Sequence, residues 1–494
     1  MNISNLKLLI FKKPSLILVA ILLIGLFFRT FKLDIFYSFE HDQDLSSWIV
    51  KDIWVDHHLR LIGQVTSIEG VFIGPLFYYL LTPFYVLAGM NPLSGAIMAV
   101  LIGLFTIWSI YFVFSKFFGK SAGIFGSAIY ATSLGPVFFD RWAVPTLPTM
   151  LWCVWLLYTL FSLAEGKTKS LIIAAILIGT IWHIHVALLP LIPLIILSFF
   201  LSKQKITPQI TILSLSILIF LTIPFWLFEL KHNFLQTKSL LFTSNNTGLI
   251  LKGLERFGKI LSSTQKILTA SLFDTWDLIP QFLAPVLTIV LFIFVFWKKL
   301  LSTKQIIILL CWVGLVILVQ QITKNPISEY YLENITIIPI LLTALLLRFF
   351  YQQKKWKYLA LGLVAVYILI NTYLLTTKPE PWHHYKFKQQ TAEFIRQDAN
   401  FHGYRCISVN YIAKYGTGVG FRYLIWWEGL HQIKQESGAP LYTIVVPYDA
   451  IPKDQLSAQF HYFGVILPKD SKPIVPQICN DPKNEPIPLL GFTN

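Results

Sequence analysis

Long apolar runs separated by short polar links dominate this chain. Such runs are long enough, or nearly so, to cross the roughly 30 Å hydrocarbon core of a bilayer as helices. They cover residues 14–28, 72–90, 94–114, 121–139, 145–164, 168–201, 209–228, 281–297, 304–323, 334–350 and 357–376. The 168–201 run is long enough for two short spans, with a break near His185 and Pro190. The pattern predicts a mostly α, polytopic bundle of about 11–13 transmembrane helices.

The polar links indicate which side of the membrane each run faces. Short links rich in lysine stay in the cytoplasm, which predicts cytoplasmic links at 203–205, 298–304 and 351–357. The N-terminus is basic and lacks a cleavage pattern after its apolar run, so it predicts a retained anchor with a cytoplasmic N-terminus. In this scheme one segment between 72 and 114 is not a full span. A short or re-entrant element around Gly74 and Pro75 would account for it.

The predicted outer regions include two that are not simple loops. Residues 249–272 place six apolar residues at helical spacing, which predicts an amphipathic helix on the membrane surface; they are Ile250, Leu254, Phe257, Leu261, Leu268 and Leu272. After Thr377 the chain becomes more polar and is punctuated by proline. A helical pattern at 386–398 and strand patterns at 405–411, 442–448 and 462–467 predict a small α/β domain.

The predicted domain organisation therefore has two parts. Residues 1–376 form the transmembrane domain, with a first outer loop at 31–71 and a second at 229–280. Residues 377–494 form an extracytoplasmic α/β domain. Cys406 and Cys479 fall in this polar part, and they could form a disulfide if it lies outside the cytoplasm.

Composition agrees with a polytopic membrane protein. Of the 494 residues 55% are hydrophobic and 13% are charged, and the mean hydropathy is +0.63. The net charge of +15 comes from 40 Lys and Arg against 25 Asp and Glu. Because much of this excess lies in the short links, membrane topology explains it, and no nucleic-acid partner is predicted.

An acidic cluster follows the first apolar run, at Glu40, His41, Asp42, Gln43 and Asp44. A charged residue at the centre of an inserted helix costs roughly 2.5–3.5 kcal/mol, so acids beside a span face a cavity or an interface. The cluster predicts a site open to one side of the membrane. The alternative is structural, since aspartates commonly cap helices.

Three motifs in this order carry a family resemblance. They are Asp42-Gln43-Asp44, then the segment from Gly74 to Tyr79 that reads GPLFYY, then Asp140-Arg141-Trp142. The arrangement resembles the GT-C superfamily, specifically family 39-like glycosyltransferases, whose members include protein O-mannosyltransferases and the lipid A aminoarabinose transferase. The motifs cover about residues 1–230, and the rest of the chain is similar in architecture only. The chain departs from the family in lacking the Asp-Glu pair of the first loop and the acid shortly after Arg141.

The resemblance implies transfer of a sugar from a polyprenyl-phosphate carrier to a glycan, lipid or protein acceptor on the outer face of the cytoplasmic membrane. A carboxylate is suited to act as general base on an acceptor hydroxyl, and positive charge or a divalent metal ion would stabilise the leaving phosphate. We therefore expect Asp42 to be the base and Asp44 its partner or a metal ligand. Arg141 is the expected clamp on the phosphate.

Other polar residues are weaker candidates for the same site. Lys231, His232 and Arg256 are candidates for donor phosphate contacts, although a basic outer loop is also typical of a solvated face. The further candidates are His41, Asp140, Glu329 and Tyr330. Structural alternatives are an interfacial position for the Arg141 side chain and an interfacial anchor at Tyr330.

Two other function classes are open at this point. A secondary transporter would predict internal repeats and paired broken helices with charges at the midplane, and the sequence shows neither. A non-catalytic partner in envelope assembly would explain the polar C-terminal part but gives no reason for the acidic cluster. Convergence of Asp42, Asp44 and Arg141 would favour the enzyme.

Overall fold

The computed structural model describes residues 16–202, 205–242, 251–274, 282–323, 327, 329–381, 384–413, 420–469 and 476–493. The chain divides into two compact units. The helical unit consists of Met1–Phe31, Ala99–Asp140 and Pro145–Lys378. The mixed unit consists of Lys32–Met98, Arg141–Val144 and Pro379–Asn494. The predicted outer loop with the acidic cluster thus belongs to the same unit as the C-terminal residues.

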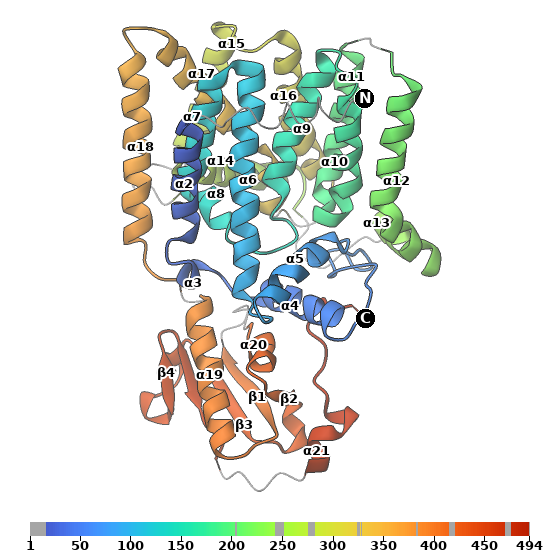
Figure 1. The fold of residues 1–494 in the computed structure, drawn as a ribbon, viewed down its shortest axis with the longest axis vertical. Coiled ribbons are helices and arrows are strands. Elements are labelled where there is room, and N and C mark those ends of the chain that lie inside the picture. Colours follow the sequence, from blue (N-terminus) through green and yellow to red (C-terminus); the bar gives the residue numbers. More distant parts are fainter. Residues whose placement is uncertain are drawn as a thin grey trace. The chain divides into compact units, whose positions relative to one another are not determined.

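Long helices make up most of the helical unit (Figure 1). Its elements are α2 (Leu16–Thr30), α6 (Leu93–Phe118, which begins in the mixed unit), α7 (Lys120–Thr132), α8 (Leu134–Phe139), α9 (Thr149–Ala164), α10 (Ser170–Ile184), η1 (Val186–Leu191), α11 (Ile192–Phe200), α12 (Pro208–Lys231), α13 (Leu235–Phe242), α14 (Gly253–Phe273), α15 (Leu283–Trp297), α16 (Thr303–Ile322), η2 (Glu329–Ile335), α17 (Ile337–Gln352) and α18 (Lys357–Thr377). Among the described residues, five helices are long and apolar enough to cross a membrane. The predicted polytopic helical bundle is confirmed.

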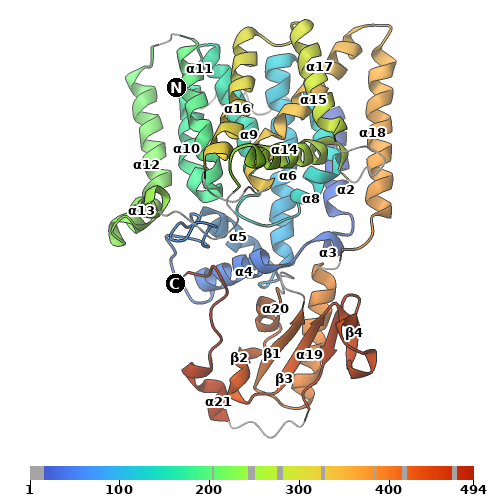
Figure 2. The same cartoon turned by 180° about the vertical axis from the view of Figure 1, so that it is seen from behind.

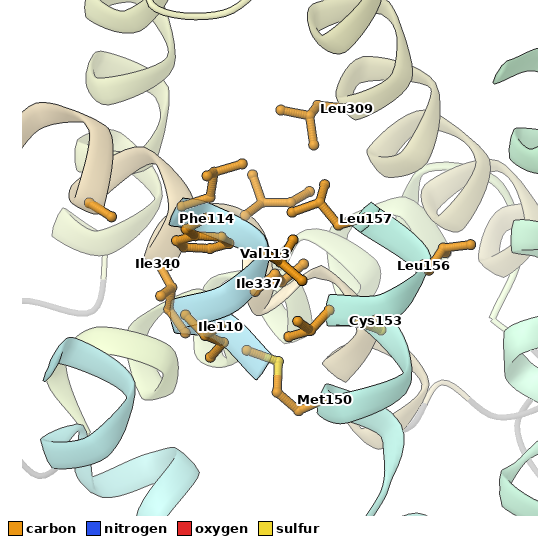
Figure 3. Packing of buried hydrophobic residues seen from close by; sticks show 14 of the residues in the cluster. Ile110, Val113, Phe114, Met150, Cys153, Leu156, Leu157, Leu309, Ile337 and Ile340 are labelled. Atoms are coloured by element: carbon orange, nitrogen blue, oxygen red, sulfur yellow. The ribbon is translucent and has the colours of Figure 1, made fainter. Parts of the chain in front are cut away.

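The buried share of each helix distinguishes central helices from peripheral ones, although α6 and α12 are equally apolar. More than half of the apolar window of α6 is buried, whereas none of that of α12 is. In both views α12 and α18 lie at opposite flanks of the helical unit (Figures 1 and 2). The core is formed where α6, α9, α16 and α17 meet (Figure 3), by side chains that include Ile110, Val113, Phe114, Met150, Cys153, Leu156, Leu157, Leu309, Ile337 and Ile340.

Two predicted irregularities are present. The long 168–201 run is broken as expected: α10 ends at Ile184, His185 is extended, and η1 contains Pro190 before α11 begins. The segment after Gly74 and Pro75 forms α5 (Leu76–Leu87), which has only 12 residues. At 1.5 Å per residue α5 is about 18 Å long, too short for a full span. If α5 does not cross the membrane, the predicted inner and outer links alternate consistently along the chain.

The predicted amphipathic helix is α14, which runs across the long helices (Figure 2). It packs against α8, α15, α16 and α17. Its buried face includes Ile260 and Leu272, while Leu254, Phe257 and Leu261 remain exposed. Ile250 lies outside the described residues. Part of the predicted apolar face is therefore exposed, and the position of α14 at a membrane surface stays a prediction.

The mixed unit contains a five-stranded sheet. Its elements are α3 (Leu33–Phe36), α4 (His41–Trp54), α5, α19 (Tyr385–Phe401), β1 (Cys406–Ala413), α20 (Arg422–Trp427), β2 (His431–Ile433), η3 (Gln435–Ser437), β3 (Leu441–Val446), η4 (Tyr448–Ala450), η5 (Lys453–Gln455), β4 (Ala458–Phe460), β5 (Phe463–Ile466), α21 (Pro476–Asn480) and η6 (Pro482–Asn484). The strand order is β2-β1-β3-β5-β4. β2, β1 and β3 are parallel, and β5 is antiparallel to both β3 and β4. The predicted helix and three strands correspond to α19, β1, β3 and β5.

The two faces of this sheet are covered differently. On one face Ile395 and Ala399 of α19 pack on the sheet residues Ile407 and Tyr442. Elsewhere a disulfide joins Cys406 in β1 to Cys479 in α21, with 5.6 Å between the Cα atoms. The disulfide attaches α21 to the sheet. The sequence left this pairing open, and the structure contains it.

Candidate active site

The acidic cluster forms the N-terminus and first turn of α4. Glu40 is the N-cap residue, and a capping box joins it to Gln43. Asp42 and Asp44 lie in the first turn, where the positive end of the helix dipole stabilises negative charge. The segment that leads into this turn is fixed to the start of α19, because the Tyr385 amide donates to the Tyr37 carbonyl at 3.0 Å.

Asp44 is a buried capping residue. Its side chain is almost fully buried, and its two carboxylate oxygens accept the backbone amides of Tyr423 at 2.8 Å and Arg422 at 3.3 Å. These amides open α20, so Asp44 joins the first turn of α4 to a helix far away in sequence. Burial raises the pKa of Asp44 to about 6, although the amides and nearby Lys388 favour the carboxylate. This geometry fits the capping alternative, and we assign no metal to Asp44.

Asp42 has different surroundings from Asp44. It is only partly buried, and within the described part of the chain its carboxylate has no hydrogen-bond or ion-pair partner. Burial raises the pKa of Asp42, and the neighbouring charge of Glu40 adds to this effect while His41 opposes it. Its charge also acts on buried Tyr78, in the motif that opens α5. Asp42 is thus a carboxylate with raised basicity and free acceptor atoms.

A buried lysine supplies positive charge next to the acidic turn. Lys388 in α19 is fully buried and donates to the carbonyl oxygen of Phe39. Burial lowers the pKa of Lys388 to about 8, against the opposite effect of Glu40 and Asp44. The sequence did contain a signal for it, because Lys388 stands in the buried stripe of α19 between Tyr385 and Ala392.

The last residues of the chain run along the acidic turn. This tail segment, residues 486–493, accepts hydrogen bonds through its backbone: the Leu490 carbonyl from His41 Nε2 at 2.9 Å and the Gly491 carbonyl from the Val65 amide at 3.1 Å. A carbonyl oxygen only accepts, so His41 carries its proton on Nε2. The tail segment therefore fixes the tautomer and orientation of the residue that precedes Asp42.

Arg60 holds the tail segment in place. Its guanidinium is buried, forms an ion pair with Asp52 and donates to Thr493, and the Phe492 ring lies 4.9 Å from it. The Tyr79 hydroxyl also bridges the Arg60 backbone, at 2.8 and 3.0 Å. Nothing in the sequence distinguishes Arg60 from a surface charge, because its partner Thr493 lies far away in the chain.

The predicted pair Asp140 and Arg141 divides between the two units. Arg141 belongs to the mixed unit together with the acidic turn, is buried, and lies with its guanidinium 5.4 Å from the Phe36 ring centre. Asp140 belongs to the helical unit, where it forms a buried ion pair of 2.6 Å with Arg29 and accepts the Tyr130 hydroxyl at 3.0 Å. Asp140 therefore has a structural partner inside the bundle, which the sequence analysis missed.

The other predicted phosphate contacts lie on two different helices, α12 and α14. Lys231 and His232 are exposed at the end of α12, and the His232 ring stacks on Phe228 with centres 4.2 Å apart. Arg256 is buried on α14 and donates to the Gln320 carbonyl at 2.7 Å. This hydrogen bond places a positive charge at the C-terminal end of α16. It is a structural role, different from the two alternatives of a solvated face and a phosphate contact.

The late Tyr-rich segment is only partly described. Glu329 and Tyr330 belong to η2, and their side chains lie outside the described part. The predictions on these two residues therefore stay open.

The sequence profile of the family described as dolichyl-phosphate-mannose-protein mannosyltransferase matches residues 73–228. No curated protein sequence matches the chain. The profile match includes the motif that opens α5 and the Asp140–Arg141 pair.

A solved structure shares the fold. ArnT from Cupriavidus metallidurans bound to undecaprenyl phosphate is 11% identical with a TM-score of 0.53, over 91% of this chain and 97% of ArnT. The oligosaccharyltransferase of Archaeoglobus fulgidus, solved with zinc and sulfate, is 11% identical with a TM-score of 0.49, over 87% of this chain and 68% of that one. The chain therefore contains a segment similar to this mannosyltransferase family and has the fold of ArnT.

Proposed function

We propose that this protein transfers a glycosyl group from a polyprenyl-phosphate donor to an acceptor hydroxyl, with Asp42 as general base. The observation that carries the proposal is the contrast between two acids of one turn. Asp44 is committed to two backbone amides, whereas the carboxylate of Asp42 has no partner among the described residues. The matched family uses dolichyl-phosphate-mannose by its description, and ArnT was solved with undecaprenyl phosphate, which supports a polyprenyl-phosphate donor.

The chemistry needs few groups from the protein. Asp42 takes the proton of the acceptor hydroxyl while that oxygen attacks the anomeric carbon, and the bond from this carbon to the phosphate oxygen breaks. The electron pair leaves with the polyprenyl phosphate, whose added charge a guanidinium such as Arg141 would stabilise. Burial makes Asp42 a stronger base than a solvated carboxylate, because its pKa is raised.

We also propose that the mixed unit lies outside the cytoplasm, with the N-terminus inside. The Cys406–Cys479 disulfide supports a location of the mixed unit outside the cytoplasm, because disulfides persist in oxidising compartments. The short length of α5 supports it independently, since the sidedness predicted from the lysine-rich links then becomes consistent.

The test is transfer by purified protein in detergent with a panel of polyprenyl-phosphate sugars, measured as released polyprenyl phosphate. Asp42→Asn is expected to lower kcat by at least 100-fold, in line with loss of a general base. Asp56→Asn is the matched control, since Asp56 lies in the same loop and forms only an exposed ion pair with Lys51. Wild-type turnover that Asp42→Asn leaves unchanged would remove Asp42 from the mechanism.

A further inference from the structure

Three side chains of metal-ligating type lie close together in the mixed unit, and none of them is among the residues assigned to catalysis. Glu380 lies in the segment before α19, His384 is the N-cap of α19, and His461 lies in the turn between β4 and β5. One ligand atom from each residue lies within 4.8 Å of the other two. His384 is fully buried, whereas Glu380 and His461 are exposed.

We propose that Glu380, His384 and His461 bind one Zn²⁺ ion. Two imidazoles and one carboxylate are a common zinc ligand set, and three protein ligands leave a fourth position for water. Ligand atoms at roughly 2.0–2.2 Å from a tetrahedral zinc lie about 3.4 Å apart. The distances between the three ligand atoms therefore have to shorten by about 1.4 Å at most when zinc binds. The exposed side chains of Glu380 and His461 supply this movement, and buried His384 is the fixed ligand.

The contacts that zinc would displace are weak. Glu380 forms a 3.5 Å ion pair with Lys32, and both side chains are substantially exposed. Exposed pairs of this kind contribute about 0–1 kcal/mol. The His384 ring accepts the Phe387 amide at 3.5 Å, which is long for a hydrogen bond. Zinc bound at Nδ1 would replace this long contact.

The two imidazole rings lie close together and share one aromatic neighbour. The His384 and His461 ring centres are 5.5 Å apart, and both rings contact Phe387, with centre distances of 4.0 and 4.8 Å. Phe387 lies in the first turn of α19, so this helix supports both imidazoles. Fixed second contacts of this kind keep ligand rings in a binding orientation.

The site would have a structural consequence for the acidic turn. His384 pairs with Ser38 in an antiparallel bridge, and Ser38 lies two residues before Glu40. A bound ion would thus connect the β4–β5 turn, the start of α19 and the segment that leads into α4. We infer that the zinc braces this junction and takes no part in the transfer reaction.

The test is zinc binding by the full-length protein without a polyhistidine tag. Protein stripped with a chelator is titrated with Zn²⁺ against a chromophoric competitor, and bound metal is counted by mass spectrometry. We expect one zinc per chain and a rise in Tm on zinc addition. His461→Asn should weaken binding at least tenfold and abolish the rise in Tm.

The variants are chosen so that folding does not decide the result. His461 has a φ of 51°, a conformation that Asn tolerates well, so His461→Asn removes the ligand without straining the turn. Glu380→Gln is the second ligand variant, and His402→Asn is the control, since His402 is an exposed histidine of α19's end that contacts Asp398. Failure of wild-type protein to retain zinc, or equal affinity in His461→Asn, would overturn the site. The measurement uses no sugar donor, so it is independent of the proposed transferase activity.

Discussion

Replacing Asp44 with alanine should loosen α20 while leaving the chemistry of Asp42 in place. The substitution removes the acceptor of two amides, Arg422 and Tyr423, in a buried setting. A buried amide left without a partner costs about 1–3 kcal/mol, and loss of a helix cap typically costs about 1 kcal/mol. The Arg422 bond is long at 3.3 Å, so most of the loss falls on Tyr423. We expect a local destabilisation of about 2 kcal/mol.

The assay is hydrogen exchange of peptides that cover α20. A local loss of about 2 kcal/mol corresponds to roughly 30-fold faster exchange of its amides when opening is at equilibrium. Asp42→Asn is the control, because Asp42 makes no hydrogen bond to any described residue. Equal protection of α20 in Asp44→Ala and wild type would refute the capping role, and equal loss in the control would show that the effect is not specific to Asp44.

The charge of Asp44 adds a pH dependence with a definite sign. Its pKa is raised from 3.8 to about 6 in the folded protein, so the folded state binds the proton more tightly than the unfolded chain. The resulting stabilisation is complete below about pH 3.8 and is lost as pH rises through about 6. The difference corresponds to roughly 3 kcal/mol. Asp44→Asn keeps an acceptor oxygen and removes the buried charge, so it should flatten α20 protection between pH 4 and 7.

Three further outcomes follow from the contacts described above. Asp140→Asn should destabilise the helical unit by about 3–5 kcal/mol, because it leaves the Arg29 charge buried without its partner; thermal unfolding in detergent measures this, and an unchanged Tm would contradict it. Arg60→Ala should release the tail segment, which is measured as faster hydrogen exchange of residues 486–493. It should also shift the acidic limb of the pH–rate profile to lower pH, because a more solvated Asp42 has a lower pKa. Reduction of the Cys406–Cys479 disulfide should lower the Tm, with Cys406→Ser insensitive to reductant.

The sequence predicted the parts of this protein whose signal is local. Apolar runs gave most of the helices, and the break before Pro190 was readable because proline removes a backbone donor. The strands β2 and β4 were missed because three residues carry too little alternation to read as a strand. The apolar composition of α5 does not reveal that the helix stops after 12 residues, and only the sidedness of the lysine-rich links predicted a short element there.

The candidate site was predictable in position but not in the roles of its residues. The cluster stood out because charge beside a span is costly. Which of its acids is committed to structure depends on Arg422 and Tyr423, more than 370 residues away, and no local pattern contains that information. The same holds for Arg29, which read as the end of a span but neutralises Asp140 inside the bundle.

The different fates of Asp42 and Asp44 follow from the geometry of one helical turn. Residues two apart on a helix point in directions about 200° apart, so the two carboxylates cannot face the same surroundings. Asp44 accepts the two amides of α20 and lies near Lys388, while the charge of Asp42 acts on Tyr78 at the start of α5. Burial of Asp42 without compensating hydrogen bonds is unfavourable for folding, yet it keeps the carboxylate basic and accessible to an incoming hydroxyl. The raised pKa of Asp42 and its oxygen atoms, unbonded by any described residue, are consistent with the proposed role as general base.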